Sequence, residues 1–323
     1  MPEPGPRKHT DLERQTGLEI RTGARLHFGL LDVQPPFGGA GMMIDEPATR
    51  IRFEPATRFA AVGPAKERVE AVAARFAAGF ELSERPACRV SVLERPAPHS
   101  GLGTGTQLAV AVAHGLHRWS TANGATLPAL EEASVRAIAD RGHRSVVGSL
   151  GFFRGGLLID RDPPQHFPVP PAWRVLLFQP QQAVCQISGA HERAQFAQLP
   201  AADPQRQARL ARLLDQHVVP ALSDGNFDRF SEAIYQYNHG SGMLFAAVQQ
   251  GPYNGRPIAD LVALLRGARV QGVGQSSWGP TVFAFCRSQA EADRLLQHPP
   301  LQGLPSRCVR PARRGHQEIA FPF

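Results

Sequence analysis

The chain has 323 residues, of which 42% are hydrophobic and 20% charged, with 31 glycines and 29 prolines. This composition is typical of a globular protein with many turns and excludes disordered and fibrous classes. Because single hydrophobic cores rarely grow beyond about 250 to 300 residues, we expect two domains. The net charge is +7 and Lys8 and Lys66 are the only lysines, so the basic excess is almost all arginine, which suits phosphate and carboxylate.

The distribution of charge and apolar residues excludes two kinds of partner. A nucleic-acid-binding protein would show a clustered basic patch with interleaved aromatic residues or a known module, and the sequence shows neither. The longest aliphatic run, Leu108–Ala113, is far shorter than the ~20 residues of a membrane span. The polar, Pro-rich segment of residues 1–17 has no secretion-signal core and predicts a flexible tail on a cytoplasmic protein.

The first half of the chain begins with strands and continues with helices. Apolar residues alternate in the predicted strands and recur every three or four residues in the predicted helices. The strands are expected around Leu26–Leu30, Ile51–Phe53 and Cys88–Val92, and the helices at about Lys66–Phe80, Gly105–Trp119 and Pro128–Gly142.

Five prolines in Asp160–Pro171 resist helix and central strand, so we place the domain boundary there. Beyond it, Asp203-Pro204 predicts the start of a helix that continues to about Leu222. Further helices are expected at Phe227–Tyr237 and Pro257–Gly267, and strands at Val175–Phe178 and Thr281–Cys286. The sequence therefore predicts an α+β protein with domains at residues 18–162 and 172–323.

A glycine-rich segment, Pro98–Gln107, lies after a predicted strand and opens a predicted helix. Alternate glycines let the backbone approach a ligand, and a helix N-terminus favours an anion, so the segment predicts a phosphate site. It is neither a Walker A nor a dinucleotide sequence, and a tight strand-to-helix turn is the structural alternative. Its candidate phosphate ligands are Ser100, Gly101, Gly103, Thr104, Gly105 and Thr106.

The segment resembles the phosphate loop of the GHMP superfamily, and its form GLGTGTQLA is similar to that of the β-ribofuranosylaminobenzene 5'-phosphate synthase family. Three more segments resemble the same family, in the same order along the chain. They are Arg25–Asp32 (RLHFGLLD), Arg141–Gly156 (RGHRSVVG followed by FRGG) and Gly272–Pro280 (GVGQSSWGP). The resemblance covers about Ile20 to Phe285.

This resemblance implies a GHMP-kinase-like fold, with an N-terminal phosphate-loop domain, a C-terminal ferredoxin-like domain and an active site between them. It also implies a decarboxylating transfer in which 4-aminobenzoate, or a hydroxybenzoate, and 5-phosphoribosyl 1-diphosphate give the C-riboside 5'-phosphate, CO2 and diphosphate. The implied pathway is tetrahydromethanopterin biosynthesis, the implied cofactor is Mg2+, and a homodimer is the family expectation.

Three polar residues of the first motif are catalytic candidates. Arg25 and His27 alternate with apolar neighbours and therefore share one face of a strand, and Asp32 follows at its end. We expect Arg25 to hold a phosphate or carboxylate and Asp32 to bind Mg2+ or orient a partner. A solvated sheet face with an ion pair is the alternative, and for His27 the two interpretations are balanced.

The later motifs add five candidates. Arg144 and Ser145 lie between a helix and glycines, where they could bind the ribose 5'-phosphate, although surface charge explains them equally well. Ser276 and Ser277 are predicted phosphate contacts. Trp278 offers a flat face to an aromatic substrate, with a core tryptophan as the alternative.

Two weaker features complete the set. His191 and Glu192 lie in a GxxE context similar to that of the family, which a helix cap would also explain. Cys88, Cys185, Cys286 and Cys308 are widely spaced, without the pattern of a zinc site, and are expected to be buried.

Two other functions compete with the synthase. An ATP-dependent GHMP small-molecule kinase would use the same loop, but it needs a carboxylate base and Mg2+ ligands near the acceptor, and no motif contains a lysine. A non-catalytic binding protein with the same fold should show eroded glycine loops, whereas both loops are complete here.

Overall fold

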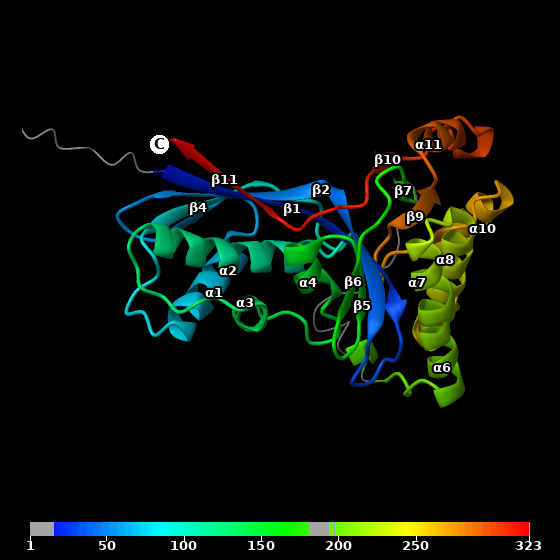
Figure 1. Cartoon of the computed structure of the whole chain (residues 1–323), viewed down its shortest axis with the longest axis horizontal. Coiled ribbons are helices and arrows are strands. Elements are labelled where there is room, and N and C mark those ends of the chain that lie inside the picture. The colour runs from blue at the N-terminus through cyan, green and yellow to red at the C-terminus, as the bar shows by residue number, and fades with distance from the viewer. Residues whose placement is uncertain (1–15, 181–193, 197, 323) are drawn as a thin grey trace, which may run out of the picture.

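Two long antiparallel strands, β1 (Thr16–Leu30) and β2 (Gly39–Pro55), run through both halves of the molecule (Figure 1). The computed structural model describes residues 16–180, 194–196 and 198–322. At one end the two strands pack against helices of the N-terminal half. At the other end they pack against helix α8 (Phe227–Gly242) of the C-terminal half. They therefore join both halves into one framework.

The N-terminal sheet has the strand order β11-β1-β2-β4-β3, with a β5–β6 hairpin attached to β2. Helices α1 and α2 pack on the sheet, α3 packs on α1 and α2, and α4 contacts β1, β2 and β5. The bounds are β3 Ala60–Val62, β4 Cys88–Glu94, β5 Leu157–Asp160, β6 Gln165–Phe167, β11 Gln317–Pro322, α1 Lys66–Gly79, α2 Thr104–Ala122, α3 Glu132–Ala139 and α4 Val147–Arg154.

The C-terminal sheet is antiparallel and has the order β10-β7-β9-β8. Helices connect β7 to β8, and another connects β9 to β10, which is the βαββαβ order of the predicted ferredoxin-like domain. The strands are β7 Arg174–Phe178, β8 Val273–Gln275, β9 Val282–Cys286 and β10 Ser306–Val309.

The helices of this half begin with α6 (Pro204–Arg212), where the Asp203 side chain accepts a hydrogen bond from the Gln205 amide as an N-cap should. A π-helical stretch, Leu213–Val218, leads from α6 into α7. The remaining helices are α7 Val219–Ser223, α8, α9 Ala246–Gln249, α10 Arg256–Gly267 and α11 Gln289–Leu296. Within the described ranges, no helix is long and apolar enough to cross a membrane.

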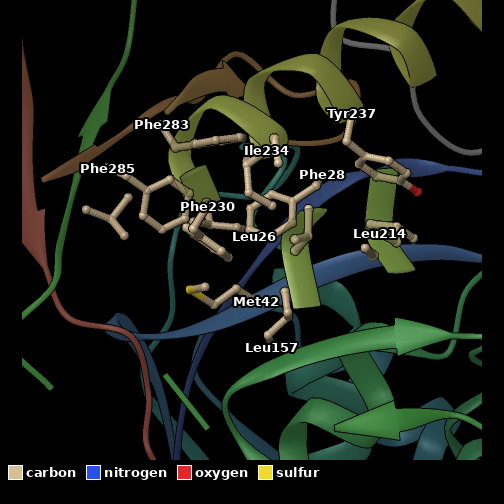
Figure 2. Packing of buried hydrophobic residues seen from close by; sticks show 14 of the residues in the cluster. Leu26, Phe28, Met42, Leu157, Leu214, Phe230, Ile234, Tyr237, Phe283 and Phe285 are labelled. Carbon is tan, nitrogen blue, oxygen red and sulfur yellow. The ribbon is translucent and has the colours of Figure 1, made fainter. Parts of the chain in front are cut away.

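The main hydrophobic core is shared by both halves. Phe28 of β1 packs against Phe283 and Phe285 of β9, with ring centroids 5.3 and 6.0 Å apart. Figure 2 shows these rings together with Met42 of β2 and Phe230 of α8. Because one core spans the junction, the spacing between the two halves is set by close packing.

The structure differs from the predicted elements in three places. The third helix is shorter than expected and ends at Ala139, where Asp140 takes a positive φ of 55°. The proline-rich boundary segment contains β6, which pairs with β5. The last strand, β11, returns to the N-terminal sheet and pairs with β1, so residues 172–323 do not all belong to the C-terminal half. Figure 1 shows β11 lying along β1.

The shared core predicts a large effect of a single substitution in it. Phe28 is fully buried, so Phe28→Ala should lower the free energy of unfolding by about 3–5 kcal/mol. Leu93→Ala is the control, because Leu93 is 44% exposed and its truncation should change stability by less than about 0.5 kcal/mol. Urea unfolding measures both, and equal midpoints for the two variants would contradict the assignment of the core.

Candidate active site

The glycine-rich segment forms a loop that turns into the N-terminus of α2. Three residues in it have positive φ, namely His99 (60°), Gly101 (81°) and Gly103 (68°), and Gly103 caps the helix. The Arg25 amide donates to the Leu102 carbonyl at 2.9 Å, which fastens the loop to β1. The Thr106 amide donates to the Gly103 carbonyl at 3.0 Å, whereas the amides of Thr104 and Gly105 precede the first helical acceptor. The helix dipole is positive there, so the loop can receive an anion.

The two glycine-rich segments touch backbone to backbone. A Cβ placed on Gly279 would lie 2.2 Å from the Gly101 Cα, and one placed on Gly101 would lie 2.3 Å from the Ser276 carbonyl oxygen. The Ser276 hydroxyl donates to the Gly101 carbonyl at 2.8 Å and accepts from the His27 amide at 3.0 Å. Side chains other than hydrogen would separate the segments, so glycine is required at both contacts.

A cavity of about 750 Å3 opens beside this junction and is lined by residues from both halves. A smaller compartment of about 210 Å3 lies at the loop itself and shares residues with the larger one. Predicted site residues that line one or both compartments are Arg25, His27, Gly101, Gly103, Thr104, Gly105, Thr106, Arg144, Ser145, Ser277 and Trp278. The structure thus brings residues of all four motifs to one place.

Positive charge dominates the cavity. Arg25, Arg68, Arg141 and Arg144 line it, whereas Asp140 is the only acidic residue among the described residues that does so. Burial, with the guanidinium of Arg68 nearby, lowers the pKa of Arg141. Arginines held this close repel one another, and a bound polyanion would relieve that repulsion.

His27 is buried on the cavity wall. Burial, together with Arg25 and Arg144, holds the pKa of His27 well below its ordinary value, so the ring is neutral at neutral pH. Its Nε2 lies 3.1 Å from the Ser145 hydroxyl, which also hydrogen-bonds the carboxylate of Asp160. Because an ionised carboxylate can only accept, Ser145 donates to Asp160 and accepts from His27, and this chain orients the ring.

Aromatic residues form another wall. Trp278 packs against Phe196 at 5.0 Å and against Phe245 at 4.9 Å between ring centroids. The guanidinium carbon of Arg144 lies 4.2 Å from the centroid of the Phe196 ring. All four residues line the cavity, so a flat aromatic ligand would contact aromatic rings and a guanidinium group there.

Three predicted site residues lie outside the two compartments. The Asp32 carboxylate accepts hydrogen bonds from the backbone amides of Val33, Gln34 and Ala202, and so holds the turn after β1. Ser276 is fully buried with its hydroxyl engaged between the two segments. Ser100 faces a different hollow near Pro47 and Thr281. None of these three side chains lines the cavity, and those of Asp32 and Ser276 bind backbone groups instead.

Several other residues of the cavity belong to no sequence pattern that indicates a site. Arg68 comes from α1, outside every motif, and Phe196 and Phe245 come from segments without a recognisable pattern. Arg141 stood inside the third motif, and its position beside Arg144 was the available signal. His191 and Glu192 lie outside the described residues, as does Cys185.

The described residues do not provide a protein-held Mg2+ site in the cavity. Mg2+ prefers oxygen ligands, usually one or two carboxylates together with substrate phosphates. Asp140, the one carboxylate in the described lining, is exposed and lies 2.8 Å from His143, while Asp32 is engaged with backbone amides. The predicted assignment of Asp32 as a metal ligand does not fit this geometry.

Comparison with known proteins agrees with this fold. The family model "GHMP kinases C terminal" matches residues 218–299. Homoserine kinase from Cytophaga hutchinsonii has the same fold, with a TM-score of 0.62 and 15% identity, covering 94% of this chain and 97% of that one. The chain thus has the GHMP-kinase-like fold that its motifs predicted, with a C-terminal part that matches the family model.

The chain is similar over most of its length to β-ribofuranosylphenol 5'-phosphate synthases. It is 25% identical to the Archaeoglobus fulgidus protein over 304 residues, which is 84% of this chain and 89% of the relative. It is 26% identical to the Methanothermobacter thermautotrophicus protein over 308 residues, which is 83% of this chain and 88% of the relative. These relatives support a related synthase role.

The junction between the glycine segments predicts different outcomes for two adjacent serines. Ser276→Ala leaves the buried His27 amide and Gly101 carbonyl without their partner, so the free energy of unfolding should fall by about 1–3 kcal/mol. Ser277→Ala is the matched control, because Ser277 is exposed, and it should change stability by less than about 0.5 kcal/mol. Chemical denaturation measures both, and an unchanged Ser276→Ala protein would refute the structural role.

Proposed function

We propose that the chain is a decarboxylating phosphoribosyltransferase that joins a 4-substituted benzoate to 5-phosphoribosyl 1-diphosphate and releases CO2 and diphosphate. The observation that carries the proposal is a single cavity that combines a glycine loop at a helix N-terminus, four arginines and an aromatic wall. The names of the relatives, which describe a ribofuranosyl phosphate product, support the same reaction class.

The ribose donor is an anion with two phosphate-bearing ends, and the cavity offers cationic groups for both. In the proposal, the diphosphate lies against the loop Gly101–Thr106 with Arg25 and Arg141, which line the smaller compartment. A Cβ on Gly103 would lie 2.8 Å from the Arg25 Nε, so the guanidinium is already in contact with the loop. The 5'-phosphate is then assigned to Arg144, because the Ser145 hydroxyl is engaged with Asp160 and His27.

The acceptor is assigned to the aromatic wall. Trp278 and Phe245 would flank its ring. The relatives are named for a ribofuranosylphenol, which favours 4-hydroxybenzoate over 4-aminobenzoate as the acceptor. The polar ring substituent is the feature that distinguishes these two acceptors.

The chemistry requires a carbon nucleophile, a leaving group and a site that excludes water. The ring carbon bearing the carboxylate attacks C1' of the ribose, and diphosphate departs with the electron pair of the C1'–O bond. The bond from the ring to the carboxylate then breaks, CO2 leaves, and its electron pair restores aromaticity. Preorganised cations stabilise the developing charge on diphosphate, which is usually the largest catalytic contribution.

We assign the product to tetrahydromethanopterin biosynthesis.

Mg2+ enters the proposal only as a counter-ion that accompanies the diphosphate. The cavity contributes one exposed carboxylate from the described residues, so substrate oxygens would supply most of its ligands. Among the side chains of the cavity, the arginines neutralise the charge of the leaving diphosphate.

A GHMP kinase is the principal alternative, because the fold also occurs in kinases. A kinase needs a carboxylate near the acceptor hydroxyl to take its proton. In the described lining that role could fall only to Asp140, which lies 2.8 Å from His143. An aromatic wall beside four arginines is better matched to a benzoate and a phosphorylated sugar.

The experiment is a product assay with purified protein, Mg2+, 5-phosphoribosyl 1-diphosphate and carboxyl-labelled 4-hydroxybenzoate or 4-aminobenzoate. We expect CO2 and diphosphate in equal amounts. Arg25→Gln should lower kcat/KM about 10- to 100-fold, since it removes charged hydrogen bonds to the donor. Arg256→Gln, at a side chain 91% exposed on α10, is the charge-matched control and should be unchanged.

Three results would contradict the proposal. ATP consumption with an alcohol acceptor, and no CO2, would move the chain to the kinases. Stoichiometric binding of the ribose donor without turnover would indicate a non-catalytic binding protein. Equal losses in Arg25→Gln and Arg256→Gln would remove the assignment of the diphosphate to the glycine loop.

A further inference from the structure

A cluster of three potential metal ligands lies where β11 crosses α2, away from the cavity. His114 comes from the middle of α2, His316 immediately precedes β11, and Glu318 lies within it. None of the three lines the compartments described above. The cluster is therefore separate from the proposed transferase site.

The three ligand atoms form a nearly regular triangle. The His114 Nε2 is 2.8 Å from the Glu318 Oε1 and 3.1 Å from the His316 Nε2, and the third side is 3.5 Å. Zn2+ binds imidazole nitrogen and carboxylate oxygen at about 2.0–2.2 Å, so two ligands of a tetrahedral zinc lie about 3.3–3.5 Å apart. Movements of a few tenths of an ångström would bring the triangle to that spacing.

The surrounding contacts orient two of the ligands. The His316 Nδ1 lies 3.1 Å from the Phe152 carbonyl, which can only accept, so Nδ1 carries the proton and Nε2 keeps its lone pair. The same ring stacks on Phe152 at 4.1 Å. Arg118 donates to the Glu318 Oε2 at 2.9 Å and leaves Oε1 directed toward the histidines. Such outer hydrogen bonds are typical of metal-binding histidine and carboxylate groups.

The His114 Nε2 donates to the Glu318 Oε1 at 2.8 Å. A metal ion bound at that nitrogen would replace this hydrogen bond, and the ring proton would move to Nδ1.

We propose that His114, His316 and Glu318 bind one divalent transition-metal ion, with Zn2+ the best fit, and that the ion fastens β11 to α2. Three protein ligands leave a fourth tetrahedral position for water. Two imidazoles and one carboxylate exclude Mg2+ and Ca2+, which prefer ligand sets made of oxygen alone.

The place of the site in the fold explains what the ion would do. Residues 317–320 and 322 of β11 are exposed and Phe321 is half-buried, so few apolar contacts hold this edge strand. Its backbone pairs with β1 alone, in antiparallel register from Thr16 to Arg21. A metal ion would strengthen the attachment of β11 to α2 that the ion pair between Arg118 and Glu318 already makes.

The test uses the full chain without an affinity tag, stripped with a chelator and then titrated with ZnCl2 by calorimetry. We expect one Zn2+ per chain and a higher Tm with the metal, because the ion binds the native state. His316→Gln and Glu318→Gln should each weaken Zn2+ binding at least about 100-fold, beyond the effect of losing an outer hydrogen bond. His117→Gln, one turn along α2, is the matched control and should bind normally.

Circular dichroism and the metal-free Tm establish that each variant is folded. If one variant does not fold, the visible absorption of the Co2+-loaded wild-type chain still decides, because a four-coordinate N2O2 site, with water as the fourth ligand, gives intense bands and a hydrated ion does not. Absence of stoichiometric binding, or binding that survives both ligand substitutions, would overturn the proposal. The three residues would then be a hydrogen-bonded triad that carries no ion.

Discussion

The close contact between Gly101 and Gly279 is the constraint on which the rest of the site depends. It joins the glycine-rich loop of one half to the glycine turn of the other without an intervening side chain. Ser276 fastens the same junction by bonding to Gly101 and to His27 of β1. As a result, the loop, the first strand and the turn that carries Trp278 are held at fixed distances. The cavity is the space left beside this junction.

The shared hydrophobic core makes that junction rigid. β1 and β2 contribute residues to hydrophobic cores in both halves, and the aromatic cluster around Phe28 packs the two halves together (Figure 2). Four arginines can therefore be held around one cavity although they repel one another. The favourable free energy of folding offsets the repulsion between the arginines. Bound phosphates would replace this repulsion with attraction between opposite charges. This relation is the physical basis for assigning the cavity to a polyanionic substrate.

The sequence predicted the fold and much of the cavity, because motifs and periodicity report local geometry. Glycines with positive φ at a helix start revealed the loop, and the alternation of Arg25 and His27 with apolar residues placed both on one face. Asp32 and Ser276, predicted as site residues, do not line the cavity, since a motif does not show whether a polar side chain turns toward a ligand or toward backbone groups. Arg68, Phe245 and the return of β11 to β1 depend on contacts between distant segments, which no local pattern encodes.

The central claim is that the junction of the two glycine segments forms a diphosphate site with an aromatic acceptor beside it. The most direct measurement is a crystal structure of the chain with 5-phosphoribosyl 1-diphosphate and a benzoate that cannot react. The account predicts diphosphate oxygens within hydrogen-bond distance of the Gly103–Thr106 amides and of Arg25, with the benzoate ring against Trp278. A diphosphate bound outside this cavity, or a benzoate bound away from Trp278, would contradict it.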